Sequence, residues 1–128
     1  MRRPIAAWTL AGTLTATGLI HLVRPTVFTG IVPSVLPDPR FWVSLSGVAE
    51  FLVAALVAVP RTRRLGGLAA AALFVAVFPA NVQMALDADG TAERVIAWGR
   101  LPLQIPLILW ALAVSRRASQ RAVSIRPR

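Results

Sequence analysis

The sequence contains no cysteine, no lysine and only five acidic residues. Without cysteine the chain cannot form a disulfide, a thiolate nucleophile, a cysteine-ligated metal centre or a dithiol redox relay of its own. Any redox chemistry in which it takes part therefore belongs to a partner or a bound cofactor. Charge is also scarce, because charged residues make up 15% of the chain, against about 25% in soluble globular domains.

Apolar residues fill the space that charged residues leave. They make up 56% of the chain, and the mean hydropathy is +0.67. This composition indicates an integral membrane protein. The 128 residues suffice for one domain, 1–128, in which we find no repeat and no interdomain linker.

Four apolar segments are long enough to cross a bilayer as helices, which requires about 20 residues for a hydrocarbon core of about 30 Å. They cover residues 5–23, 41–59, 65–86 and 95–114. The short link between the second and third segments favours a helical hairpin. We therefore predict an all-α fold, an antiparallel four-helix transmembrane bundle with short loops. Pro79, Pro102 and Pro106 fall inside the segments, where we expect kinks.

Arginine distribution predicts the orientation of these segments. Ten of the fourteen arginines lie on one side of the predicted membrane: Arg2, Arg3, Arg61, Arg63, Arg64, Arg116, Arg117, Arg121, Arg126 and Arg128. By the positive-inside rule this side is cytoplasmic, with both termini and a basic tail, residues 115–128. The net charge of +9 therefore reflects topology, and we expect contact with lipid and no nucleic-acid partner. The arginine-only, alanine-rich composition suggests a bacterial plasma membrane.

Glu50 is the only charged residue in the segment 41–59. A carboxylate at membrane depth costs about 2.5–3.5 kcal/mol on insertion scales, so such residues usually face a bundle interior and indicate a functional site. Arg100, in the fourth segment, is its expected partner. An alternative interpretation is that this pair only holds the bundle together.

If successive helices run in opposite directions, other polar residues lie at the same depth in the membrane as Glu50. Thr9, Thr13, Thr17 and His21 recur at every fourth position, which predicts a stripe facing the bundle, although each threonine can instead bond a carbonyl one turn back. In the second segment, Ser46, Gly47, Glu50 and Ala54 share a narrow face that permits close helix approach. We predict a binding site in the outer half of the membrane, formed by His21, Glu50, Asn81, Arg100 and Gln104. We identify no catalytic constellation, and one histidine with scattered neutral groups fits no usual metal geometry.

The connection between the first two segments, residues 24–40, is rich in proline and half apolar. It contains Pro25, Pro33, Pro37 and Pro39, with Val27, Phe28, Ile31 and Val35 between them. We expect a stiff segment on the outer surface, either a lid over the polar cluster or an ordinary interfacial connector.

The order and spacing of several short motifs resemble those of the DoxX-like family of small four-helix membrane proteins. The motifs are GLIH at 18–21, Pro25, IVP at 31–33, LP at 36–37, SGVAE at 46–50, VFPANVQM at 77–84 and RLPLQ at 100–104. The resemblance covers nearly the whole chain. It implies association with quinones or oxidoreductases, because some members of that family are subunits of a thiosulfate to quinone electron-transfer complex.

Two classes of function follow. In the first, the protein is an accessory or binding subunit whose pocket holds the head group of a lipophilic molecule, such as a quinone or a lipid, without a covalent cofactor. Its protein partner is then an oxidoreductase or a second copy of the chain. In the second, Glu50 and His21 change protonation and the bundle moves protons or a small solute. A purely structural scaffold remains an alternative to both.

Overall fold

Every regular element in residues 4–124, the part of the chain that this computed structural model describes, is helical. The elements are α1 (Ile5–Val23), η1 (Pro25–Val27), η2 (Thr29–Ile31), α2 (Pro39–Ala58), α3 (Arg63–Ala76), α4 (Phe78–Asp87) and α5 (Thr91–Ser124). Four helical stretches are long and apolar enough to cross a membrane: α1, α2, the consecutive pair α3 and α4, and α5. For residues 4–124 the predicted all-α class is confirmed, and so are four helical stretches long and apolar enough to span a membrane.

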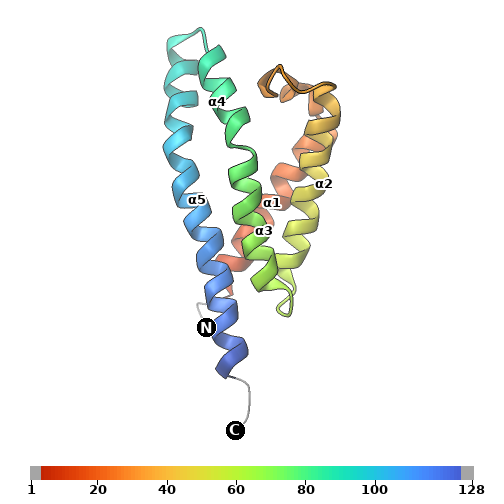
Figure 1. Cartoon of the computed structure of the whole chain (residues 1–128), viewed down its shortest axis with the longest axis vertical. Helices are drawn as coiled ribbons and strands as arrows, with labels where there is room; N and C mark the ends of the chain where they lie inside the picture. The colour runs from red at the N-terminus through yellow and green to blue at the C-terminus, as the bar shows by residue number, and fades with distance from the viewer. Residues whose placement is uncertain (1–3, 125–128) are drawn as a thin grey trace.

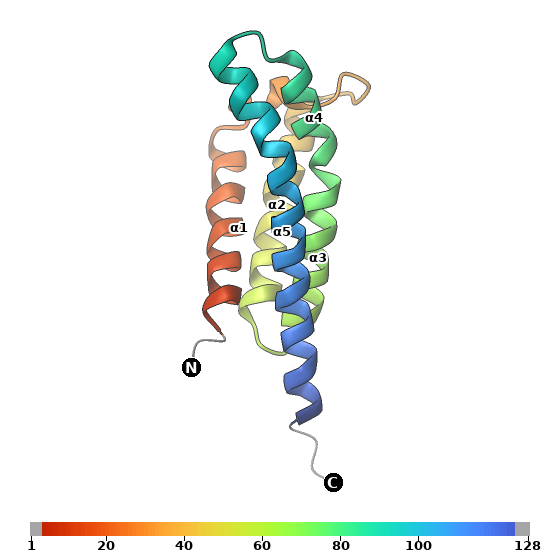
Figure 2. The same ribbon diagram turned by 90° about the vertical axis from the view of Figure 1, so that its left-hand side faces the viewer.

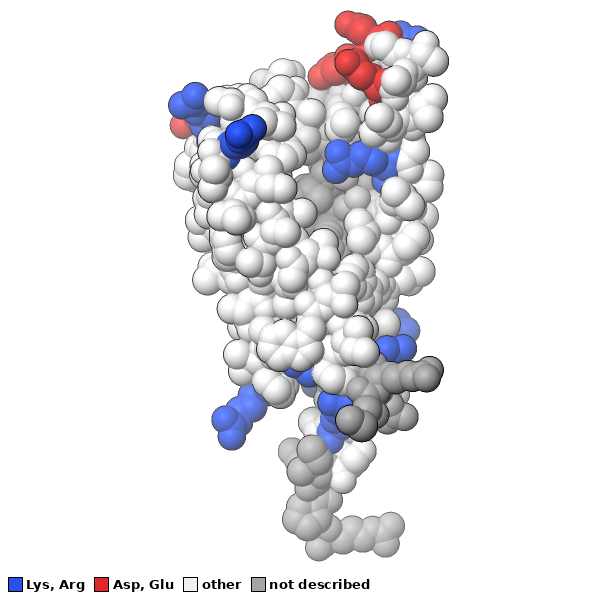
Figure 3. All heavy atoms as spheres, turned by 180° about the vertical axis from the view of Figure 1, so that it is seen from behind, with Lys and Arg blue, Asp and Glu red and all other residues white. Residues whose placement is uncertain are grey.

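The helices run along the long axis of the molecule (Figures 1 and 2). One end, which we call the basic end, holds the start of α1, residues 59–62 and the last turns of α5. Its described arginines are Arg61, Arg63, Arg64, Arg116, Arg117 and Arg121. The opposite end, which we call the acidic end, holds residues 24–38 and 88–90, and Figure 3 shows its acidic atoms in red. Arg2, Arg3, Arg126 and Arg128 lie outside the described residues.

The core lies in the half of the molecule nearer the basic end. There α1 packs on α2, α2 on α3, and α3 on α5. Its largest fully buried side chains are Leu10, Leu14 and Val57, surrounded by small residues such as Ala70 and Ala111. Toward the acidic end the pair α1 and α2 separates from the pair α4 and α5 (Figure 1). This separation leaves room for a cavity.

The third predicted segment is broken into two helices. α3 ends at Ala76, and α4 begins at Phe78 with Pro79 in its first turn. Proline lacks the N–H that a continuous helix requires and fits the first turn of a new one. The expected kink at Pro79 is therefore a helix boundary, whereas Pro102 and Pro106 lie inside the continuous helix α5.

The fourth segment is longer than predicted. We expected it to end at residue 114 and a tail to follow, but α5 continues to Ser124 and projects past the other helices (Figure 2). Residues 125–128, the rest of the predicted tail, lie outside the described residues.

Candidate functional site

A cavity of about 580 Å³ lies between the two separated helix pairs. All five residues predicted to form the site line it: His21, Glu50, Asn81, Arg100 and Gln104. Most of its remaining wall is apolar, as expected for a small-molecule site, and its volume falls within the usual range of about 300–1,000 Å³. The structure thus brings the predicted residues together, and ligand binding by them stays a prediction.

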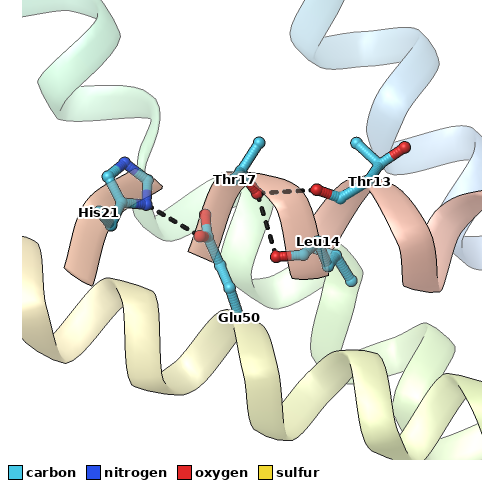
Figure 4. A network of polar contacts seen from close by, with 5 residues as sticks. All are labelled: Thr13, Leu14, Thr17, His21 and Glu50. Carbon is cyan, nitrogen blue, oxygen red and sulfur yellow. Dashed lines mark hydrogen bonds and ion pairs between the residues drawn. The ribbon is translucent and has the colours of Figure 1, made fainter. Parts of the chain in front are cut away.

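The polar contact between α1 and α2 joins His21 to Glu50. Nδ1 of His21 lies 2.8 Å from Oε2 of Glu50, and the two side chains point toward each other (Figure 4). Glu50 is buried, with 7% of its surface exposed. A contact this short requires one proton between the two atoms, because neither a bare imidazole nitrogen nor a carboxylate oxygen can donate without it. This hydrogen bond therefore joins α1 to α2 at the wall of the cavity.

Two glycines allow this contact. A Cβ on Gly18 would lie 2.9 Å from the backbone oxygen of Gly47, and one on Gly47 would lie 3.0 Å from the backbone oxygen of Gly18. Small residues at a membrane helix interface permit such close backbone approach. The predicted small-residue face of α2 therefore packs against α1, one turn away from the His21 and Glu50 pair.

The expected pairing of Glu50 with Arg100 was wrong. The ion pair found among residues 4–124 is that of Glu50 with His21. Arg100 is exposed and donates from Nη1 to Sδ of Met84 at 3.4 Å. The reason is the separation of the helix pairs, since Glu50 belongs to α2 and Arg100 to α5, on opposite sides of the cavity.

Asn81 and Gln104 form a second polar group, between α4 and α5. Nδ2 of Asn81 donates to Oε1 of Gln104 at 3.0 Å, and Nε2 of Gln104 donates to the backbone oxygen of Phe74. Phe74 lies in the last turn of α3, where carbonyls lack further helical partners. Gln104 therefore satisfies a carbonyl at the helix boundary that Pro79 creates, and both amide side chains are buried.

The threonines of α1 bond their own helix, as the alternative interpretation held. Oγ1 of Thr9, Thr13 and Thr17 donates to the carbonyl four residues earlier, and Figure 4 shows this for Thr17. Thr13 and Thr17 nevertheless line the cavity, and Thr9 does not. Ser46 is another lining residue, and its buried Oγ has no hydrogen-bond partner among the described residues. Ser46 could have been predicted as a lining residue, because the sequence places it on the same helix face as Glu50.

The connection between α1 and α2 lines the cavity at the acidic end, and both interpretations of it, as a lid or as a connector, stay predictions. Phe28 and Ile31 were expected there, and the lining residues Val32 and Leu36 were not anticipated. The ring of Phe28 packs edge-on against His21, with centroids 4.3 Å apart. Other contacts tie the segment to the bundle: Nε1 of Trp42 donates to the carbonyl of Pro37 at 2.8 Å, and η2 contacts α4.

The cavity reaches the surface of the molecule on the face that Figure 3 shows. Figure 3 shows a hollow in the upper half of the rear face, between the side that carries α1 and α2 and the side that carries α4 and α5, with arginine atoms at its edge. Thr13, Thr17 and Ile20 of α1 line the cavity and yet are exposed, as is Arg100 of α5. The hollow seen in Figure 3 lies between α1 and α5, two helices that touch only slightly. Leu45 of α2, Ala76 of α3 and Pro79 of α4 also line the cavity and are exposed, so its wall reaches the surface between α2 and the α3–α4 pair as well.

The site offers hydrogen-bonding groups, the Arg100 cation and the hydrogen-bonded pair of His21 and Glu50. In residues 4–124 no group of three or more histidine, cysteine or acidic side chains is placed to hold a metal ion. Hydrogen-bonding groups of α1, α2 and α5 therefore face one apolar cavity, through His21, Ser46 and Arg100.

The chain belongs to a family described as Domain of unknown function (DUF8561), whose profile matches residues 10–115. The matched region includes the whole cavity and its cover. Comparison with curated proteins finds no match, and neither does comparison with solved structures.

Proposed function

We propose that this DUF8561 protein is an accessory or binding subunit of a membrane, whose cavity holds the polar head of a lipophilic molecule such as a quinone. The observation that carries the proposal is the cavity itself. Its walls are mainly apolar, and polar side chains from α1, α2, α4 and α5 line it. Ligand sites in membrane bundles combine an apolar enclosure with a few polar groups that fix orientation.

In this proposal the polar residues divide the work of recognition. His21 and Arg100 hydrogen-bond oxygen atoms of the head, and Ser46 adds a hydroxyl that has no hydrogen-bond partner within residues 4–124. Glu50 fixes the orientation of the His21 ring through the 2.8 Å contact. Asn81 and Gln104 hold α4 against α5 and keep the cavity wall in place.

The proposed setting is a bacterial plasma membrane, which the chain spans as an antiparallel four-helix bundle. The basic end, with both termini and the last turns of α5, faces the cytoplasm by the positive-inside rule. The cavity then lies in the outer half of the bilayer. The motif resemblance to DoxX-like proteins supports an oxidoreductase as the partner, and the lack of cysteine assigns the redox step to that partner or to the ligand.

Native mass spectrometry of the gently extracted protein tests the proposal. We expect one small molecule per chain in the wild type, and its loss in Glu50→Gln and Arg100→Ala, with helical circular dichroism unchanged. Asp89→Asn and Arg40→Ala are matched controls, since both residues lie at the acidic end outside the cavity lining. Unchanged small-molecule occupancy in both Glu50→Gln and Arg100→Ala would contradict the proposal. A protein partner without a small molecule would instead favour a structural assembly subunit.

The contact between His21 and Glu50 favours a second candidate, proton-coupled transport of a small solute. A histidine and an acid that share a proton inside a membrane are suited to proton transfer. Vesicles with a pH-sensitive dye inside would then show flux that vanishes in Glu50→Gln and persists in Asp89→Asn. Flux that survives Glu50→Gln excludes Glu50 as the carrier.

A further inference from the structure

The segment between α1 and α2 lines the cavity toward the acidic end, and the hollow of Figure 3 opens toward the side. Phe28, Ile31 and Leu36 of this segment lie between the cavity and the acidic end of the molecule. The opening, by contrast, runs along α1 from Thr13 to Ile20. Since α1 has 19 residues and about 20 span a bilayer core, Thr13 lies near mid-membrane and the opening faces lipid chains.

Arg100 is a cation at this opening without a counter-ion. In residues 4–124 it forms no ion pair, and its hydrogen bond there goes to Sδ of Met84, a weak acceptor. The guanidinium is always charged and carries five N–H donors arranged to bind carboxylate or phosphate. The cavity's acid, Glu50, is engaged by His21 across the cavity.

The geometry points to an anionic amphiphile as the occupant, which enters from the bilayer between α1 and α5 and places its carboxylate or phosphate on Arg100. This inference rests on the proposed function and specifies its ligand class. The acid group binds Arg100 at the opening, and the apolar part fills the cavity of about 580 Å³. Apolar walls and one unpaired cation match the two halves of such a molecule.

Equilibrium binding of radiolabelled palmitate to the protein in phosphatidylcholine nanodiscs tests the inference. We expect Arg100→Gln to bind palmitate at least about tenfold more weakly than the wild type, which corresponds to about 1.4 kcal/mol. Arg40→Gln, which removes a charge at the same end outside the cavity, should bind as the wild type does. Arg100→Lys should recover part of the loss, because it restores the charge. Methyl palmitate, which lacks the charge, should compete poorly against palmitate.

Results that differ from these separate the anionic ligand from the proposed pocket for a lipophilic molecule. Equal competition by methyl palmitate, or unchanged palmitate binding by Arg100→Gln, overturns the anionic ligand while a lipophile pocket stands. Absence of any palmitate binding overturns the inference, and the native mass spectra then judge the pocket separately. Added phosphatidylglycerol distinguishes the sources of the anion: displacement of palmitate assigns the site to a phospholipid headgroup, and resistance assigns it to a free acid.

Discussion

At the scale of single residues, Gly18 and Gly47 determine whether His21 and Glu50 can meet. The backbones of α1 and α2 are so close there that an added Cβ on Gly18 would lie 2.9 Å from a backbone oxygen. A backbone atom cannot rotate away as a side chain can. The helices must therefore separate if either glycine gains a side chain.

Gly18→Ala should lower the free energy of unfolding by about 1–3 kcal/mol, the usual cost of overpacking. Gly12→Ala is the matched control in the same helix, because a Cβ at position 12 would meet no atom within 4 Å apart from its chain neighbours and the nearby backbone of α1. Thermal unfolding in detergent measures both variants, and we expect a lower Tm for Gly18→Ala alone. Equal Tm values for the two would contradict the close approach of α1 and α2.

The sequence predicted which residues line the cavity better than it predicted their partners. Alternating helix directions place His21, Glu50, Asn81, Arg100 and Gln104 at one depth, and depth depends only on residue spacing. Pairing depends also on how far apart the helices stand. Because the separation of α2 from α5 follows from tertiary packing, the partner of Glu50 could not be obtained from spacing alone.

At the scale of helices, Arg63 closes the end of α2. Its Nε donates to the carbonyl of Val57 and its Nη2 to that of Ala58, each at 2.8 Å. These carbonyls lie in the last turn of α2, where a positive charge also interacts favourably with the negative end of the helix dipole. The residue is buried, unlike its neighbour Arg64.

Arg63→Gln should therefore cost more stability than Arg64→Gln, although both remove one arginine from the basic end. We expect a loss of about 1.5–3 kcal/mol for Arg63→Gln, the range of hydrogen bonds to charged groups, and little change for Arg64→Gln. Unfolding in mixed micelles with increasing dodecyl sulfate measures the difference. Identical transitions would mean that the cap contributes nothing.

Helix boundaries were predicted where the residues themselves define them. Proline at position 79 ends one helix and starts the next, and the apolar segment 5–23 coincides with α1. The end of α5 was missed, because arginines at 116, 117 and 121 ended the apolar segment without ending the helix. A hydropathy pattern indicates how far an apolar segment extends and does not indicate where the helix ends. Arginine is a good helix former, so the helix can continue past the apolar segment.

At the scale of the whole molecule, the two ends differ in charge, and this difference predicts orientation. The described part of the basic end carries arginines and no acidic residue. Four of the five acids of the chain lie in the segments that form the acidic end or within three residues of them: Asp38, Asp87, Asp89 and Glu93. The natural absence of cysteine makes the chain suitable for labelling at single introduced positions.

Pro60→Cys, at the basic end, should react with a membrane-impermeant maleimide only after the cells are opened. Asp89→Cys, at the acidic end, should react in intact cells, because the positive-inside rule places that end outside. Gel shifts of the labelled protein report both results, and the cysteine-free parent provides the background. The reverse pattern would invert the proposed orientation and move the cavity to the inner leaflet.

An opening on the side of the bundle changes the concentration scale that governs occupancy. For a molecule that enters from the bilayer, the relevant concentration is its mole fraction among the lipids and not its concentration in water. This mole fraction sets the occupancy of the cavity. Added inert lipid would then empty the cavity at constant total ligand, while added buffer would leave it filled. Cells would control such a site through the composition of the membrane.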